Sequence, residues 1–156
     1  MTYQEKIIYL SRYSKAKQKI RLLDKQIEEM NDRIMALRSA RISPRVKLTG
    51  MPGARNAKDL MAEYAAKLDK LQRECEKYKR KKIRQIEKQQ EIKAEIEREL
   101  EKMPTQRYQN ILWARFIYGM TWAQTAKFAN YSEPQSKRLY KAAIAEFDVR
   151  TKDDTK

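Results

Sequence analysis

Apolar residues recur at alternating intervals of four and three along residues 6–38, and this pattern restricts the fold more than any other feature. The stripe consists of Tyr9, Tyr13, Ala16, Ile20, Leu23, Ile27, Met30, Ile34 and Leu37. A heptad of this kind places one apolar seam along a helix, and an isolated helix cannot bury such a seam. We therefore expect a helix over about 4–38 that packs against a second long helix.

A second helix is expected over 57–103, where the same spacing resumes. Its seam comprises Met61, Tyr64, Leu68, Leu71, Cys75 and Tyr78, and an apolar face continues in a shifted frame with Ile83, Ile86, Ile92, Ile96, Leu100 and Met103. Cys75 is accordingly expected to be a buried apolar residue and not a reactive thiol. The two helices predict an all-α, antiparallel coiled-coil hairpin over 1–103, in which the C-terminal residues or a second chain cover the surplus length of the second helix.

Residues 39–56 interrupt the helical pattern with Pro44, Gly50, Pro52 and Gly53, which predicts a loop. The loop is basic, and two interpretations remain open: a solvated linker, or an arm that contacts DNA phosphates or enters a groove. The residues of such an arm are Arg41, Arg45, Lys47 and Arg55. A basic block over 77–84 is open to the same two interpretations, a DNA backbone contact or a solvated face.

The charge of the whole chain favours a polyanionic partner. Net charge is +15, from 36 Lys and Arg against 21 Asp and Glu, and nucleic acid is the most common partner of so basic a chain. With no histidine and one cysteine, the usual acid–base groups and common zinc sites are lacking. We therefore expect no catalytic residues, no metal and no cofactor.

The same composition bears on localisation. No apolar run approaches the ~20 residues that a membrane span needs, and a single cysteine suits a reducing compartment. We expect a cytoplasmic protein that does not associate with membranes.

Residues 104–149 predict three short helices. Pro104 precedes an apolar helix over 106–118, and Gly119 suits the left-handed position that ends it. Thr121 can cap the next helix, Asn130 and Tyr131 form a turn, and Ser132 with Gln135 forms a capping box for the third helix. This order predicts a helix-turn-helix module, followed by a disordered tail over 150–156.

The module resembles the C-terminal, region-4 helix-turn-helix of bacterial sigma factors, over residues 116–126 and 131–143. The whole chain is similar to the ArpU/RinA-like transcriptional regulators encoded by phages of Gram-positive bacteria. This resemblance implies sequence-specific binding of double-stranded DNA in the bacterial nucleoid, and activation of phage late or packaging genes with host RNA polymerase. A promoter-melting helix of the sigma type is lacking, so the protein would act beside the polymerase and its own sigma factor.

Residue by residue, the resemblance assigns base contacts to Glu133, Gln135, Ser136 and Arg138, and phosphate contacts to Thr121, Lys127, Lys137 and Lys141. The physical logic agrees, because residues at the start of a recognition helix meet base edges, and Arg or Gln can make bidentate contacts. Sigma factors bury an aliphatic residue at the position of Ser136, which is a departure.

Two alternative functions stay open at this point. One is a DNA-packaging recognition subunit similar to a small terminase, which also joins a helix-turn-helix to a coiled coil. The other is a structural coiled-coil protein whose helix-turn-helix only packs. A homodimer is expected, because two seams on two helices would be buried better in a four-helix arrangement, although a monomer also remains open.

Overall fold

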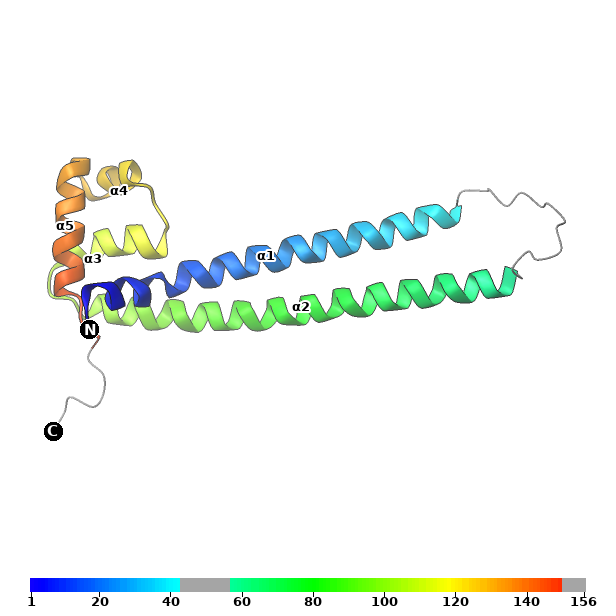
Figure 1. The fold of residues 1–156 in the computed structure, drawn as a ribbon. Coiled ribbons are helices and arrows are strands. Elements are labelled where there is room, and N and C mark those ends of the chain that lie inside the picture. Colours follow the sequence, from blue (N-terminus) through cyan, green and yellow to red (C-terminus); the bar gives the residue numbers. More distant parts are fainter. Residues whose placement is uncertain (43–56, 150–156) are drawn as a thin grey trace, which may run out of the picture. The chain divides into compact units, whose positions relative to one another are not determined.

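The computed structural model describes residues 1–42 and 57–149, and all regular structure in these two ranges is helical (Figure 1). The elements are α1 (Tyr3–Ile42), α2 (Ala57–Glu101), α3 (Gln106–Leu112), the π-helical turn η1 (Trp113–Ile117), α4 (Trp122–Ala129) and α5 (Glu133–Glu146). The predicted all-α class is confirmed. Within these ranges, no helix has both the length and the apolar character required of a membrane span.

The bounds of both long helices differ from the predicted ones. α1 continues to Ile42, beyond the predicted end at residue 38, and α2 stops at Glu101, short of the predicted 103. The residue before a proline avoids helical backbone angles, and Pro104 follows the end of α2 within three residues. Because α1 continues to Ile42, the predicted loop over 39–56 begins too early, and Arg41 belongs to α1. Arg45, Lys47, Arg55 and the predicted tail over 150–156 lie outside the described residues.

The described residues form two compact units, which differ from the predicted division at Pro104. One unit joins Met1–Lys19 to the described part of Gln85–Lys156, and the other is Ile20–Arg84. The prediction was wrong because the first turns of α1 and the last turns of α2 share an apolar core with α3 and α5. Each unit is described by itself below.

In the unit Ile20–Arg84, α1 and α2 pair in antiparallel orientation, as the heptads predict. The Lys82 ammonium lies 2.5 Å from the Asp24 carboxylate, and the Cys75 thiol donates to the Asn31 side-chain oxygen at 3.5 Å. Met30, Ile34 and Cys75 are buried, and Cys75 is only 3% exposed, as expected of an apolar seam position. Partly buried side chains complete this narrow core: Ile27, Leu68, Leu71 and Tyr78.

The seam of α2 keeps one frame, contrary to the predicted shift after Tyr78. Continuing the intervals of four and three from Tyr78 leads to the half-buried polar residues Lys82, Gln85 and Gln89, and then to Ile92 and Ile96. Ile83, assigned to the seam from sequence, is 57% exposed, and Met61 is 50% exposed. The pairing of Lys82 with Asp24 explains how a cation can occupy a seam position.

The other unit has the larger core. It contains Leu10, Ala16, Ile92, Ile96, Leu100, Met103, Leu112, Ile117, Ala143, Ile144 and Phe147. Leu10 and Phe147 are fully buried, and burial of a side chain of this size stabilises a fold by about 1.5–3 kcal/mol. The surplus length of α2 is thus covered by the C-terminal helices of the same chain, one of the two possibilities expected from sequence.

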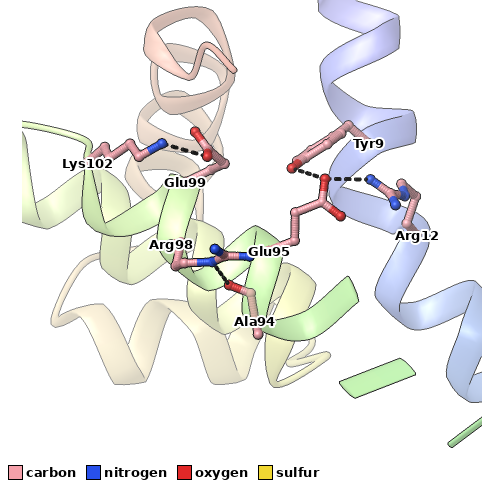
Figure 2. Close-up of polar contacts among 7 residues, drawn as sticks. All are labelled: Tyr9, Arg12, Ala94, Glu95, Arg98, Glu99 and Lys102. Carbon is pink, nitrogen blue, oxygen red and sulfur yellow. Dashed lines mark hydrogen bonds and ion pairs between the residues drawn. The ribbon is translucent and has the colours of Figure 1, made fainter. Parts of the chain in front are cut away.

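Polar contacts connect α1 to α2 and α5 in this unit. The Tyr9 hydroxyl donates to the Glu95 carboxylate at 2.8 Å, and the Arg12 guanidinium donates to the same oxygen at 3.1 Å (Figure 2). Burial and then the hydrogen bond to Glu95 raise the pKa of Tyr9 above its usual range. Burial raises the pKa of the Glu95 carboxyl, but hydrogen bonds from Arg12 and Tyr9 outweigh it, so the net pKa is lowered. The Lys6 ammonium donates to the Ala145 carbonyl oxygen at 2.9 Å.

Candidate nucleic-acid interface

The approach to α4 is fixed by a left-handed glycine. Gly119 has φ +64° and follows η1, where the Tyr118 amide donates to the Trp113 carbonyl at 3.0 Å in the π-helical pattern. The Met120 amide then donates to the Ala114 carbonyl at 2.9 Å. A Cβ at residue 119 would meet nothing within 4 Å, so the backbone angle and not the available space favours glycine. The predicted left-handed helix end is confirmed.

Thr121 begins α4 with a full capping box. Its hydroxyl accepts from the Gln124 amide at 3.3 Å, and the Thr121 amide donates to the Gln124 side chain at 2.9 Å. The cap was predicted but the box was not, although Thr121 and Gln124 have the spacing that defines one. Thr121 is exposed, so its hydroxyl can also face a phosphate.

A tight turn joins α4 to α5 (Figure 1). Asn130 has φ 57°, the Tyr131 amide donates to the Ala126 carbonyl at 3.0 Å, and the Asn130 amide donates to the Lys127 carbonyl at 3.4 Å. This pair of bonds defines a Schellman motif, in which asparagine can replace the usual glycine. Ser132 and Gln135 then form the predicted capping box, with the Gln135 amide donating to the Ser132 hydroxyl at 3.3 Å. The direction of α5 is therefore fixed at its first residue.

The exposed side of α5 carries most of the side chains predicted to contact DNA. Glu133, Gln135, Lys137, Arg138 and Lys141 are exposed. Gln135 and Arg138 face away from the side that buries Ala143 and Ile144, whereas Glu133 shares the angular position of Ile144 and is exposed because it is the first residue of the helix. The cations on α4 and α5 are Lys127, Lys137, Arg138 and Lys141, and the acids are Glu133 and Glu146. The start of α5 is thus a polar, mostly basic surface.

Ser136 is the exception among the predicted base contacts. Its exposed fraction is 0%, and its hydroxyl oxygen has no hydrogen-bond partner in the described residues. Ser136 precedes Tyr140 by four residues and Ala143 by seven, so it lies on the inner stripe of α5. A buried side chain cannot reach a base edge, and the prediction for Ser136 was wrong.

Gln135 is exposed, but its cap limits what it can contact. Its side-chain oxygen accepts from the Ser132 amide at 3.2 Å and from the Ser132 hydroxyl at 3.1 Å. The side-chain NH₂ group remains available as a donor. A bidentate contact to adenine, which needs both groups, would require the capping box to open.

Trp122 positions two cations beside α5. The Arg115 guanidinium lies 4.2 Å from the centre of the Trp122 ring, and the Lys137 ammonium lies 5.7 Å from it. Arg115 also donates to the Met120 carbonyl oxygen, and the Tyr140 and Trp122 rings are perpendicular, with their centres 5.3 Å apart. Arg115 was missed from sequence because its partners come from later residues that no local pattern connects to it.

Comparison with known proteins adds no assignment. No family model, curated protein or solved structure matches the chain. Within residues 1–42 and 57–149, no group of three or more Cys, Asp or Glu side chains is placed to hold a metal ion.

Proposed function

We propose that the protein is a sequence-specific DNA-binding transcription regulator that places the start of α5 in the major groove. The observation that carries the proposal is the exposure of Gln135 and Arg138, which face away from the buried side of the helix, together with the exposure of Glu133 at its first residue. A helix fits the major groove, and the residues at its start meet base edges. The left-handed turn at Asn130 and the capping box at Ser132 support a fixed presentation of these side chains.

Each exposed residue has a specific role in this proposal. Arg138 can donate two hydrogen bonds to guanine, and Glu133 can accept one from cytosine. Gln135, with its oxygen held by Ser132, would donate to a base acceptor through its NH₂ group. We assign phosphate contacts to four exposed residues at or on α4 and α5: Thr121, Lys127, Lys137 and Lys141.

The regulatory part of the proposal rests on the resemblance to sigma region 4 and to ArpU/RinA-like phage regulators. We propose activation of phage late or packaging genes beside the host RNA polymerase. A homodimer suits this role, because dimers bind paired half-sites.

The test begins with selection of a preferred site from a randomised duplex library. Affinity for that site and for random duplex is then measured for the parent and for Arg138→Ala, with Arg107→Ala as the control. Arg107 is an exposed arginine at the start of α3. We expect Arg138→Ala to lose about 1–3 kcal/mol on the selected site only, and Arg107→Ala to retain the preference.

Unchanged preference in Arg138→Ala would show that α5 does not read the sequence. Ring-shaped oligomers on a packaging site, without an effect on transcription, would favour the packaging subunit instead. The structural coiled-coil alternative predicts no salt-dependent binding of DNA at all.

A further inference from the structure

A second basic surface lies on α2 within the unit Ile20–Arg84, and the proposed function does not use it. Five cations follow one another at intervals of three and four residues: Lys70, Arg73, Lys77, Arg80 and Arg84. All five are exposed. We refer to these five residues as the outer basic face.

The outer basic face points away from α1. Each of its first four cations stands two residues after a seam residue, as Lys70 follows Leu68 and Lys77 follows Cys75. Two residues correspond to about 200° around a helix, so the face is nearly opposite the buried seam. With a rise of about 1.5 Å per residue, it presents a cation roughly every 5 Å over a length of about 21 Å.

Little within the described residues neutralises this face. Arg73 pairs with Asp69 at 3.0 Å, but the two side chains are 78% and 57% exposed, so the pair contributes little. Glu76 is engaged with Lys79 at 3.3 Å. Glu74 lies four residues after Lys70 and Glu87 lies three after Arg84, but neither forms an ion pair with a described residue. Among residues 1–42 and 57–149, the other four cations form no ion pair, and their charge faces solvent.

We propose that the outer basic face binds the phosphate backbone of duplex DNA without regard to sequence, as a contact surface independent of α5. Its length of about 21 Å exceeds the ~12 Å width of the major groove, so its cations can reach phosphates of both strands. Duplex DNA carries one charge per ~1.7 Å of axis, which supplies a phosphate for each cation.

The chemistry of the face favours DNA over a membrane or an acidic protein. A helix that lies on a membrane needs an exposed apolar side opposite its basic side. That side of α2 is occupied by the seam with α1, where Met30, Ile34 and Cys75 are buried. Protein interfaces are enriched in aromatic residues as well as arginine, and the outer basic face has arginines but no aromatic residue.

The test compares two triple variants of the full chain with equal reductions in charge. The first variant is Lys77→Gln, Arg80→Gln and Arg84→Gln. The control is Lys25→Gln, Arg33→Gln and Arg38→Gln, which removes three exposed cations from α1 in the same unit. Circular dichroism verifies that both variants retain the helical content of the parent.

Affinity for random-sequence duplex DNA is measured as a function of salt. We expect the log–log slope of the first variant to be shallower than that of the parent by up to about 2.7, which is about 0.9 for each phosphate that the variant no longer neutralises. The control should keep the parent slope. Equal slopes in the two variants would overturn the proposal, as would binding of the parent to vesicles of anionic lipid but not to DNA.

This proposal can fail separately from the proposed function. In a chain that carries Arg138→Ala, adding the first triple variant should still make the salt slope on random duplex DNA shallower. A chain that selects a preferred sequence but whose slope is unaffected by the first triple variant would retain the α5 proposal and reject this one. If the parent shows no sequence preference, and its salt-dependent binding disappears in the first triple variant, the outer basic face is retained and the α5 proposal is rejected.

Discussion

The Lys6 ammonium donates a hydrogen bond to the Ala145 carbonyl oxygen at 2.9 Å, and this bond ties the first turn of α1 to the last turn of α5. The last carbonyl groups of a helix lack partners within the helix, and the negative end of the helix dipole favours a cation there. Lys6 is buried, so water screens this contact only partly. A residue far away in sequence thus stabilises the C-terminal end of the proposed recognition helix.

Replacing Lys6 with Met should destabilise this unit by about 1–2 kcal/mol, because a carbonyl group loses its charged donor while the apolar stem is retained. The free energy of unfolding is measured by urea denaturation, with circular dichroism as the signal. Lys15→Met serves as the control, since Lys15 is an exposed cation on the same helix, and it should change stability by no more than about 0.5 kcal/mol. Equal losses in the two variants would mean that the Lys6–Ala145 bond contributes nothing specific.

Tyr9→Phe should alter how stability depends on alkaline pH. Burial, followed by the hydrogen bond to Glu95, raises the pKa of Tyr9 in the folded state, so the folded state binds this proton more tightly than the unfolded state. The contribution is complete below the unfolded pKa of about 10 and is lost as pH rises towards the folded value. The parent should therefore be more stable than Tyr9→Phe below about pH 10, and this difference in stability should shrink as pH rises above about 10. Thermal unfolding at several pH values measures this, and a constant difference between the two proteins would contradict it.

Gly119→Ala should cost about 1–2 kcal/mol, because an alanine must adopt a left-handed backbone at φ +64°. No collision contributes, since the added Cβ meets nothing within 4 Å. Asn130→Gly provides the opposite case, because glycine adopts the left-handed conformation of Asn130 at no steric cost. Thermal unfolding of both variants should show a loss only for Gly119→Ala. Comparable losses in both would point to side-chain contacts as the cause.

Ser136→Ala should leave stability unchanged or raise it by up to about 1 kcal/mol. The variant removes a buried hydroxyl that has no hydrogen-bond partner in the described residues. Ser132→Ala, four residues earlier, removes a hydroxyl that caps α5 and should cost about 1 kcal/mol. Denaturation of the pair gives the comparison, and the DNA preference of Ser136→Ala should equal that of the parent. A relaxed preference would restore Ser136 as a base contact.

Features that depend on neighbours in sequence could be predicted. The seam from Met30 to Ile34, the left-handed Gly119 and the capping box at Ser132 all follow from spacing and backbone chemistry over a few residues. Each is present in the structure. Helix ends were less accurate. The apolar pattern continues to Met103 although α2 stops at Glu101, ahead of Pro104, and α1 continues beyond the last residue of its apolar stripe, Leu37.

The errors arose where polar residues occupy core positions. Lys82, Gln85 and Gln89 continue the seam of α2, and Ser136 belongs to the inner stripe of α5. A search for apolar periodicity passes over all four. The contact of Lys6 with Ala145 joins residues far apart in sequence and could not be predicted, because it depends on the tertiary packing. The contact of Arg115 with Trp122 depends on how the chain turns at Gly119, and it was not predicted either.

The shared core of α1, α2, α3 and α5 has a practical consequence for dissecting the chain. A fragment that begins at Pro104, made to isolate the helix-turn-helix, would lack Leu10, Ile96 and Leu100. These residues share a core with Ile144 and Phe147, whose apolar side chains would become exposed to water. Such a fragment would tend to aggregate, and its failure to bind DNA would say nothing about α5. A minimal version should instead splice residues 1–19 to residues 85–149 through a short artificial connector.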